Sequence, residues 1–184
     1  MHNAINFIAF QAGWFTSILC AANGMPWSAA GAVLMVVAVH LARARKAAAE
    51  LKLALAAALV GAIFENALSL AGWTRFTGGE LVPGTAPLWI VAQWMMFATT
   101  LNLSLSWLKP KPIVAAIFGA VGAPLSYFAG ERLDAIQIPD RDAALVALAL
   151  GWALLLPLLL RLARRWDGYA ISPASEITVR VGHA

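Results

Sequence analysis

The chain has 184 residues, of which 61% are hydrophobic and only 12% are charged. Soluble globular domains are about 45–50% apolar and about 25% charged. This composition therefore excludes a soluble enzyme, a disulfide scaffold, a disordered chain and an ordinary nucleic-acid-binding domain. The formal net charge is +4. Its basic residues gather at the ends of apolar segments, which indicates membrane topology and no nucleic-acid partner.

Six apolar segments follow one another along the chain. They span residues 4–22, 26–42, 51–72, 86–108, 112–130 and 143–163. A helix that crosses a bilayer needs about 20 residues. Because backbone polar groups in lipid must be hydrogen-bonded within the segment, these runs predict helices; barrel strands would alternate polar and apolar residues. The predicted fold is all-α: a polytopic bundle of six transmembrane helices over residues 1–165, followed by a short cytoplasmic tail over residues 166–184.

The basic residues divide unevenly between the two sets of predicted helix ends. Three lie on one side, namely Arg75, Arg132 and Arg141. Ten lie on the other side, namely Arg43, Arg45, Lys46, Lys52, Lys109, Lys111, Arg161, Arg164, Arg165 and Arg180. Cytoplasmic loops collect Lys and Arg, so the sequence predicts that both termini are inside.

Glu65 is the ionisable residue that falls clearly within a predicted membrane helix. It lies about seven residues from the outer end of its segment, at a depth of roughly 10 Å. A carboxyl group there costs on the order of 1–3 kcal/mol on insertion scales, which makes it a candidate functional group. Small residues on its helical stripe, Gly61, Ser69 and Gly72, predict that it faces other helices. A ligand site and a hydrogen-bonded clamp between helices both remain open.

Further polar residues lie at the depth of Glu65. Gln93 belongs to the fourth segment, and Ser126 and Tyr127 belong to the fifth. They predict a polar group in the outward half of the bundle, with an interhelical clamp as the alternative.

Tryptophan is abundant, with eight residues in the chain. Trp89 and Trp94 flank Gln93, and with Trp14 and Trp152 they are placed to line a flat apolar pocket or to pack in the core. We therefore assign Glu65, Gln93, Trp89, Trp94, Ser126 and Tyr127 to a candidate ligand-binding site.

A second polar group is expected nearer the cytoplasmic side. It contains Asn6, Asn102 with Ser106, and His40. Basic residues follow His40, so we expect an interfacial side chain there rather than a ligand. Gln11 lies near the middle of the first segment. Gln11 and Asn102 complete the candidate ligand-binding residues.

Several kinds of catalytic or cofactor site lack the residues they need. The histidines are His2, His40 and His183, no two of which share a segment, and no predicted membrane helix contains Asp. A zinc site needs three protein ligands and a haem needs an axial ligand on an inward face, so we predict no metal and no cofactor. No P-loop, dinucleotide fingerprint or nucleophile elbow is present.

Two segments are distinctive: Phe-Gln-Ala-Gly-Trp at residues 10–14 and Phe-Ala-Thr-Thr-Leu-Asn at residues 97–102. On these motifs the chain resembles a family of small bacterial inner-membrane proteins catalogued as a domain of unknown function. The resemblance covers residues 4–165. It implies the bacterial inner membrane as the location and carries no established activity. Members of that family are often encoded near lipid-modifying enzymes, such as methyltransferases that act on fatty acyl chains, so the resemblance implies such enzymes as candidate partners.

The leading hypothesis is a lipid-handling membrane protein. It would hold an acyl chain or an isoprenoid in a Trp-lined groove, with Glu65 and Gln93 at the polar end. The alternatives are a small proton-coupled transporter, an intramembrane enzyme that uses Glu65 as general acid or base on a lipid headgroup, and a structural partner of a lipid-modifying complex. The sequence defines neither the lipid, nor a reaction, nor the oligomeric state.

Overall fold

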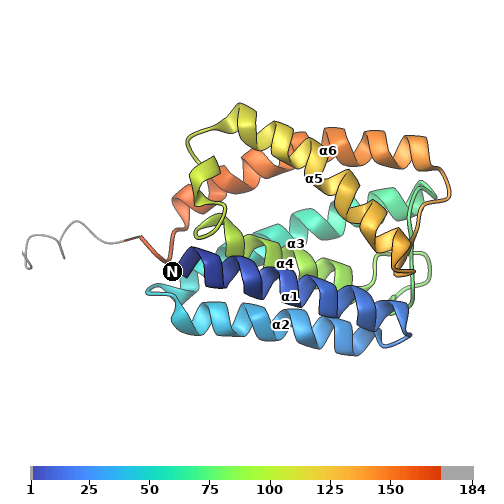
Figure 1. Ribbon diagram of the computed structural model, residues 1–184, viewed down its shortest axis with the longest axis horizontal. Coiled ribbons are helices and arrows are strands. Elements are labelled where there is room, and N and C mark those ends of the chain that lie inside the picture. The colour runs from blue at the N-terminus through green and yellow to red at the C-terminus, as the bar shows by residue number, and fades with distance from the viewer. Residues whose placement is uncertain (1, 171–184) are drawn as a thin grey trace, which may run out of the picture.

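The computed structural model describes residues 2–170, which form an all-helical bundle with one small sheet (Figure 1). The α-helices in this range are α1 (His2–Ala22), α2 (Pro26–Arg43), α3 (Ala47–Leu70), α4 (Leu88–Leu101), α5 (Pro112–Arg132) and α6 (Arg141–Arg165). A short 3₁₀ helix, η1 (Ser106–Leu108), follows α4. Strands β1 (Arg75–Phe76) and β2 (Ile136–Gln137) pair antiparallel, with Phe76 opposite Ile136. The predicted all-α class is confirmed.

Helix boundaries fall where the sequence supplies turn and capping residues. Pro26 and Pro112 occupy the first turns of α2 and α5, where a missing N–H breaks no helical hydrogen bond. Gly24 has a φ of 72° in the turn between α1 and α2, a conformation that costs glycine little. At the start of α6 the Asp140 carboxylate accepts a hydrogen bond of 3.1 Å from the Ala143 N–H.

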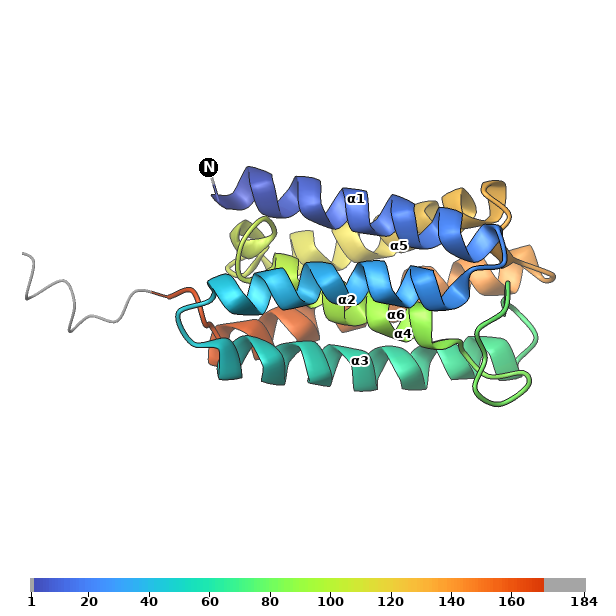
Figure 2. The same ribbon diagram turned by 90° about the horizontal axis from the view of Figure 1, so that it is seen from below.

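The helices lie in three pairs, with α5 against α6, α3 against α4, and α1 against α2 (Figures 1 and 2). Helix α4 is central: it contacts α1, α2, α3 and α6, and most of its side chains are buried. Helices α1 and α5 lie on the same side of the bundle but are not among the pairs in extensive contact. This arrangement leaves a space between them that α4 and α6 close from behind.

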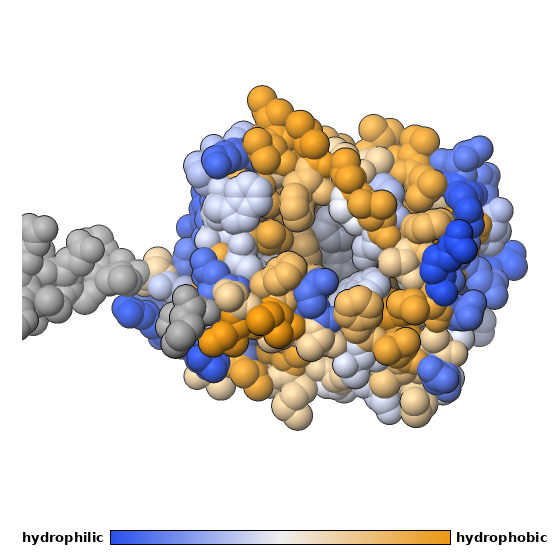
Figure 3. All heavy atoms as spheres, viewed as in Figure 1, coloured by the Kyte–Doolittle hydropathy of each residue, from blue (hydrophilic) through white to orange (hydrophobic). Residues whose placement is uncertain are grey.

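On the face shown in Figure 3, apolar residues cover much of the surface between two more hydrophilic ends of the bundle. Large exposed apolar residues follow the outward faces of three helices: Leu55, Leu59 and Ile63 on α3, Ile113, Ile117 and Val121 on α5, and Val146, Leu150 and Leu154 on α6. Within residues 2–170, five helices are long and apolar enough to cross a membrane, namely α1, α2, α3, α5 and α6. Such a surface indicates an integral membrane protein.

The fourth helix is shorter than predicted. The sequence pattern predicted a helix over 86–108, whereas α4 has 14 residues and ends at Leu101. At 1.5 Å per residue it is roughly 21 Å long. An asparagine from α1 ends it: the Asn6 Nδ2 donates to the Thr99 carbonyl at 3.2 Å, and its Oδ1 accepts from the Ser104 hydroxyl at 2.7 Å. The freed backbone groups of α4 therefore find a partner on another helix.

Glycine permits close helix contact at a point that shapes the site. A Cβ atom added to Gly119 of α5 would lie 2.3 Å from the Trp152 carbonyl oxygen of α6. Only glycine allows the two backbones to approach so closely. The tight contact between α5 and α6 therefore fixes Trp152 next to the middle of α5.

Candidate functional site

A cavity of about 490 Å³ lies between α1 and α5, and residues of α4 and α6 also line it. Figure 3 shows the corresponding hollow in this face of the molecule. Aromatic side chains form much of its wall: Phe7, Phe10, Trp14, Phe15, Trp94, Phe97, Phe118, Tyr127 and Trp152. Small-molecule sites have volumes of about 300–1,000 Å³ and are mostly apolar with a few polar groups. The cavity matches that description in size and in lining.

Glu65 is the buried carboxyl group of this site. It lies on α3 with 0% of its surface exposed, inside the bundle as its stripe of small residues predicted. Its Oε1 accepts hydrogen bonds from the Tyr127 hydroxyl of α5 at 2.5 Å and from the Trp94 Nε1 of α4 at 2.9 Å. One carboxyl oxygen therefore joins α3, α4 and α5.

Gly61, one turn before Glu65, makes room for the Trp94 ring. A Cβ atom at Gly61 would lie 2.2 Å from the Trp94 Cγ, which is shorter than any real contact. The indole therefore sits in a slot on α3 that only glycine leaves open. This slot holds the Trp94 Nε1 at the Glu65 carboxyl group.

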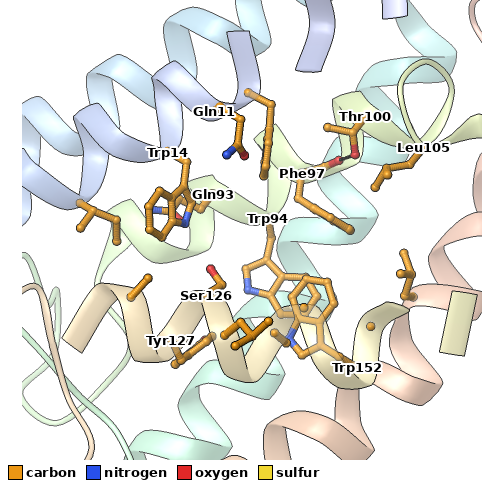
Figure 4. Close-up of a pocket in the computed structure, with 18 of the residues that line it drawn as sticks. Gln11, Trp14, Gln93, Trp94, Phe97, Thr100, Leu105, Ser126, Tyr127 and Trp152 are labelled. Atoms are coloured by element: carbon orange, nitrogen blue, oxygen red, sulfur yellow. Dashed lines mark hydrogen bonds between the residues drawn. The ribbon is translucent and has the colours of Figure 1, made fainter. Parts of the chain in front are cut away.

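Trp94 also stacks on Trp152 of α6, with ring centroids 4.6 Å apart and planes at 27°. In Figure 4 the two indoles lie one over the other beside Tyr127. We call Glu65, Trp94, Tyr127 and Trp152 the Glu65 cluster. Two of its polar atoms, the Glu65 Oε2 and the Trp152 Nε1, are buried and have no hydrogen-bond partner among the described residues.

The structure brings most of the predicted site residues to this cavity. Those that line it are Gln11, Glu65, Gln93, Trp94, Ser126 and Tyr127. Of the polar residues predicted at the depth of Glu65, Tyr127 is its hydrogen-bond partner, whereas Gln93 and Ser126 are not. The Gln93 Nε2 instead donates to the Ser17 hydroxyl at 3.1 Å.

Trp89 and Asn102 lie away from the cavity. Trp89 is fully buried, and its ring packs edge-on against Phe76 with centroids 5.7 Å apart. Its Nε1 donates to the Gly78 carbonyl at 3.2 Å, so it holds the long loop before α4. Asn102 belongs to a second polar cluster near the other end of the bundle.

That second cluster surrounds Glu50, a residue that the sequence reasoning missed. Glu50 is 2% exposed, and its Oε2 pairs with the His40 Nε2 at 2.8 Å. Its Oε1 accepts from the Asn102 Nδ2 and from the Gly168 N–H, both at 2.7 Å. We call Glu50, His40, Asn102, Gly168 and Tyr169 the Glu50 cluster. The predicted third segment began at residue 51, whereas α3 begins at Ala47 and places Glu50 inside the helix.

His40, in the last turn of α2, is 7% exposed and pairs with Glu50, so its side chain faces protein and does not extend from the helix end as a snorkelling residue would. A signal was available in the sequence: Glu50 follows His40 across a short turn, and depth matching had already grouped His40 with Asn102. A carboxyl group near two such side chains is a candidate partner for both.

Residues 166–170, from the predicted tail, pack against the helices here and supply Gly168 and Tyr169 to the Glu50 cluster. The Lys46 N–H donates to the Gly168 carbonyl at 3.1 Å, and the Tyr169 hydroxyl donates to the His40 carbonyl at 2.8 Å. Burial and the nearby Glu50 carboxylate raise the pKa of the Tyr169 phenol, which keeps the hydroxyl protonated as a donor. We call residues 166–170 the anchored segment; the rest of the predicted tail lies outside the described residues.

Five helices that are long and apolar enough to cross a membrane indicate a polytopic membrane protein, with an aromatic cavity and a buried carboxyl group inside its bundle. The chain belongs to the DUF2878 family, described as proteins of unknown function, and the match extends over residues 3–158. The predicted membership of a family of unknown function is confirmed. Curated proteins and solved structures contain no match to the chain.

Proposed function

We propose that this protein handles lipids in the bacterial inner membrane and holds an apolar chain in the cavity, with the polar end of the lipid at the Glu65 cluster. One observation carries the proposal: the cavity is lined by aromatic side chains and lies in an apolar face of the bundle. A lipid there exchanges one apolar environment for another. Its affinity then depends on shape and on a few polar contacts.

The rim of the cavity supports lateral access from the bilayer. Several lining residues are also exposed on the outer surface, namely Phe7 and Phe15 of α1 and Phe118 and Leu125 of α5. Water-soluble ligands gain nothing from such a rim. A lipid tail can pass between α1 and α5 without leaving an apolar surface.

We propose six membrane crossings with both termini inside. Helix α4 is short for a crossing, and the turn after it together with η1 would complete the span. Non-helical backbone at membrane depth is tolerated where it is buried in protein or lines a cavity. Ser104 and Leu105 of this turn line the cavity.

The basic residues support this orientation. Arg45 and Lys46 lie between α2 and α3, and Lys109 and Lys111 precede α5. These two connections are at the same end of the bundle as the last turn of α6 (Figure 1). Single cysteines in a Cys20→Ser background test the topology. Positions Arg45 and Lys109 are expected to be protected from an impermeant thiol reagent in intact spheroplasts, and Gly78 to be labelled. Labelling at Lys109 with protection at Gly78 would contradict the orientation.

Occupation of the cavity is tested by filling it. Gly122 of α5 lines the cavity, and a Cβ atom added there meets no atom within 4 Å. Gly122→Phe therefore adds a ring at the cavity wall, and its Cβ atom meets no neighbouring atom. Gly31→Phe is the matched control, because Gly31 is exposed on α2, has the same open surroundings and does not line the cavity.

Native mass spectrometry of the purified proteins gives the readout. We expect a copurified lipid on the wild type and on Gly31→Phe, and its loss from Gly122→Phe. Equal lipid on all three proteins, or none on any of them, would contradict lipid binding in this cavity.

A further inference from the structure

The two unpartnered polar atoms of the Glu65 cluster constrain the polar end of the ligand, given the proposed lipid site. The Glu65 Oε1 is fully used by Tyr127 and Trp94, but the Oε2 of the same carboxyl group has no partner among the described residues. The Trp152 Nε1 is a second buried orphan. Buried polar groups without partners cost roughly 1–3 kcal/mol each, so they are rare unless they have another role.

The two orphans belong to one connected group of side chains. Trp94 bonds Glu65 through its Nε1 and stacks on Trp152 at a centroid distance of 4.6 Å. Both Glu65 and Trp152 contribute to the cavity wall. Trp94 thus contacts both residues that carry an orphan atom, Glu65 through a hydrogen bond and Trp152 through stacking.

We propose that the ligand is a neutral lipid alcohol, a long apolar chain that ends in a hydroxyl group bound between Glu65 and Trp152. The Trp152 N–H is only a donor, so its partner must accept a hydrogen bond. The Glu65 Oε2 accepts when the carboxyl group is ionised and donates when it carries the proton. A hydroxyl group both donates and accepts, so one oxygen atom satisfies Trp152 and Glu65 in either state.

Charged head groups fit this site poorly. None of the described residues that line the cavity is Lys, Arg or His, so a phosphate or a carboxylate would lie beside Glu65 without a counter-charge. An ammonium group would pair with the Glu65 carboxylate, but it carries no acceptor and leaves the Trp152 N–H unbonded. A hydrocarbon without a polar end satisfies neither atom.

Both orphan atoms are closed to solvent in this structure. A hydroxyl group therefore reaches them only when side chains of the Glu65 cluster shift, and this cluster contains the stacked rings of Trp94 and Trp152. Binding is then expected to change the near-ultraviolet circular dichroism of these stacked indoles. Gln93 is held elsewhere by Ser17, so it does not compete for the hydroxyl group.

The test measures binding of tritiated hexadecan-1-ol to the purified wild-type protein in detergent. The competitors are unlabelled hexadecan-1-ol, hexadecane, hexadecanoate and hexadecylamine, which share one chain length. We expect the alcohol to compete about tenfold or more better than the other three, the factor that corresponds to one hydrogen bond of ordinary strength. Trp152→Phe keeps the aromatic ring and removes the donor, so it is expected to weaken alcohol binding about tenfold, whereas Trp27→Phe, at an exposed site, leaves it unchanged.

The outcomes separate this inference from the proposed function. If all four competitors bind equally well and Gly122→Phe abolishes their binding, the cavity binds lipids but the hydroxyl assignment is wrong. If hexadecanoate or hexadecylamine binds best, the assignment is also wrong. If Gly122→Phe leaves all binding intact, the lipid site itself is wrong. The wild-type competition series decides the question even if Trp152→Phe does not fold.

Discussion

Substitutions at Glu65 measure how far its carboxyl group holds α3, α4 and α5 together. The Oε1 accepts two buried hydrogen bonds, at 2.5 Å from Tyr127 and 2.9 Å from Trp94. Interhelical hydrogen bonds in membranes contribute about 0.6 kcal/mol on average and about 1.7 kcal/mol at most. The two bonds together therefore bound the structural contribution of Glu65 at roughly 3 kcal/mol.

Three variants divide this contribution. Glu65→Gln keeps a carbonyl oxygen for both donors and should change the free energy of unfolding by less than about 0.6 kcal/mol. Tyr127→Phe removes one bond and should cost about 0.6–1.7 kcal/mol. Glu65→Leu removes the oxygen that accepts both bonds and leaves two donors buried, so it should cost about 1–3 kcal/mol.

Unfolding in mixed micelles, followed by circular dichroism during titration with a denaturing detergent, gives these free energies. The double variant Tyr127→Phe with Glu65→Leu is the control, because a direct bond makes the two costs non-additive. If Glu65→Leu proves as stable as the wild type, or if the free-energy costs of the two single variants add in the double variant, the hydrogen bonds of Glu65 do not join these helices.

Three further expectations concern packing and the Glu50 cluster. Gly61→Ala pushes a Cβ atom into the Trp94 ring and should destabilise the protein by about 1–3 kcal/mol. Gly31→Ala, where the added Cβ atom meets open space, should stabilise α2 by about 0.5–1 kcal/mol. Equal changes in the thermal stability of the two variants would contradict the tight fit of Trp94 against Gly61. Glu50→Ala leaves the Asn102 and Gly168 donors unpaired in a buried place, so it should loosen the anchored segment. Trypsin should then cleave at the start of this segment faster than in the wild type, and an unchanged cleavage rate would contradict the claim that Glu50 anchors it. Because the pKa of Tyr169 is raised above the ordinary value of 10.0, its contribution to folding is present below that pH and is lost as the pH rises through the raised pKa. The phenolate absorbance that Tyr169→Phe removes should therefore have its titration midpoint above pH 10.0, and a midpoint at or below 10.0 would contradict the burial of this phenol.

Much of the fold follows from the apolar pattern. The predicted segments for α1, α2, α5 and α6 end within two residues of the observed helices. Those helices expose large apolar residues along much of their length, so their hydropathy reports their position directly. Helix α4 is surrounded by protein, and its end depends on Asn6 from α1, a tertiary contact that the sequence of one segment does not contain.

The sequence predicts the depth of the candidate site residues along their helices but not the direction in which their side chains point. Depth matching grouped Glu65 with Gln93, Ser126 and Tyr127, and in the structure all four residues line one cavity. Consecutive residues of a helix point about 100° apart, so only one of Gln93 and Trp94 can face Glu65. Trp94 of α4 faces Glu65 because Gly61, one turn before Glu65 on α3, leaves room for its ring. The sequence of the fourth segment alone does not contain this information.

The position of a bound lipid tests the central claim most directly. A hexadecan-1-ol with a photoactivated diazirine in its chain would be crosslinked to the protein in nanodiscs, and the labelled residues mapped by mass spectrometry. We expect labels on the cavity wall, at residues such as Phe10, Phe97 and Phe118, and their loss from Gly122→Phe but not from Gly31→Phe. Labels confined to the outward face of α3, at Leu55, Leu59 and Ile63, would mean that the alcohol contacts the protein only as bulk lipid and would contradict the account.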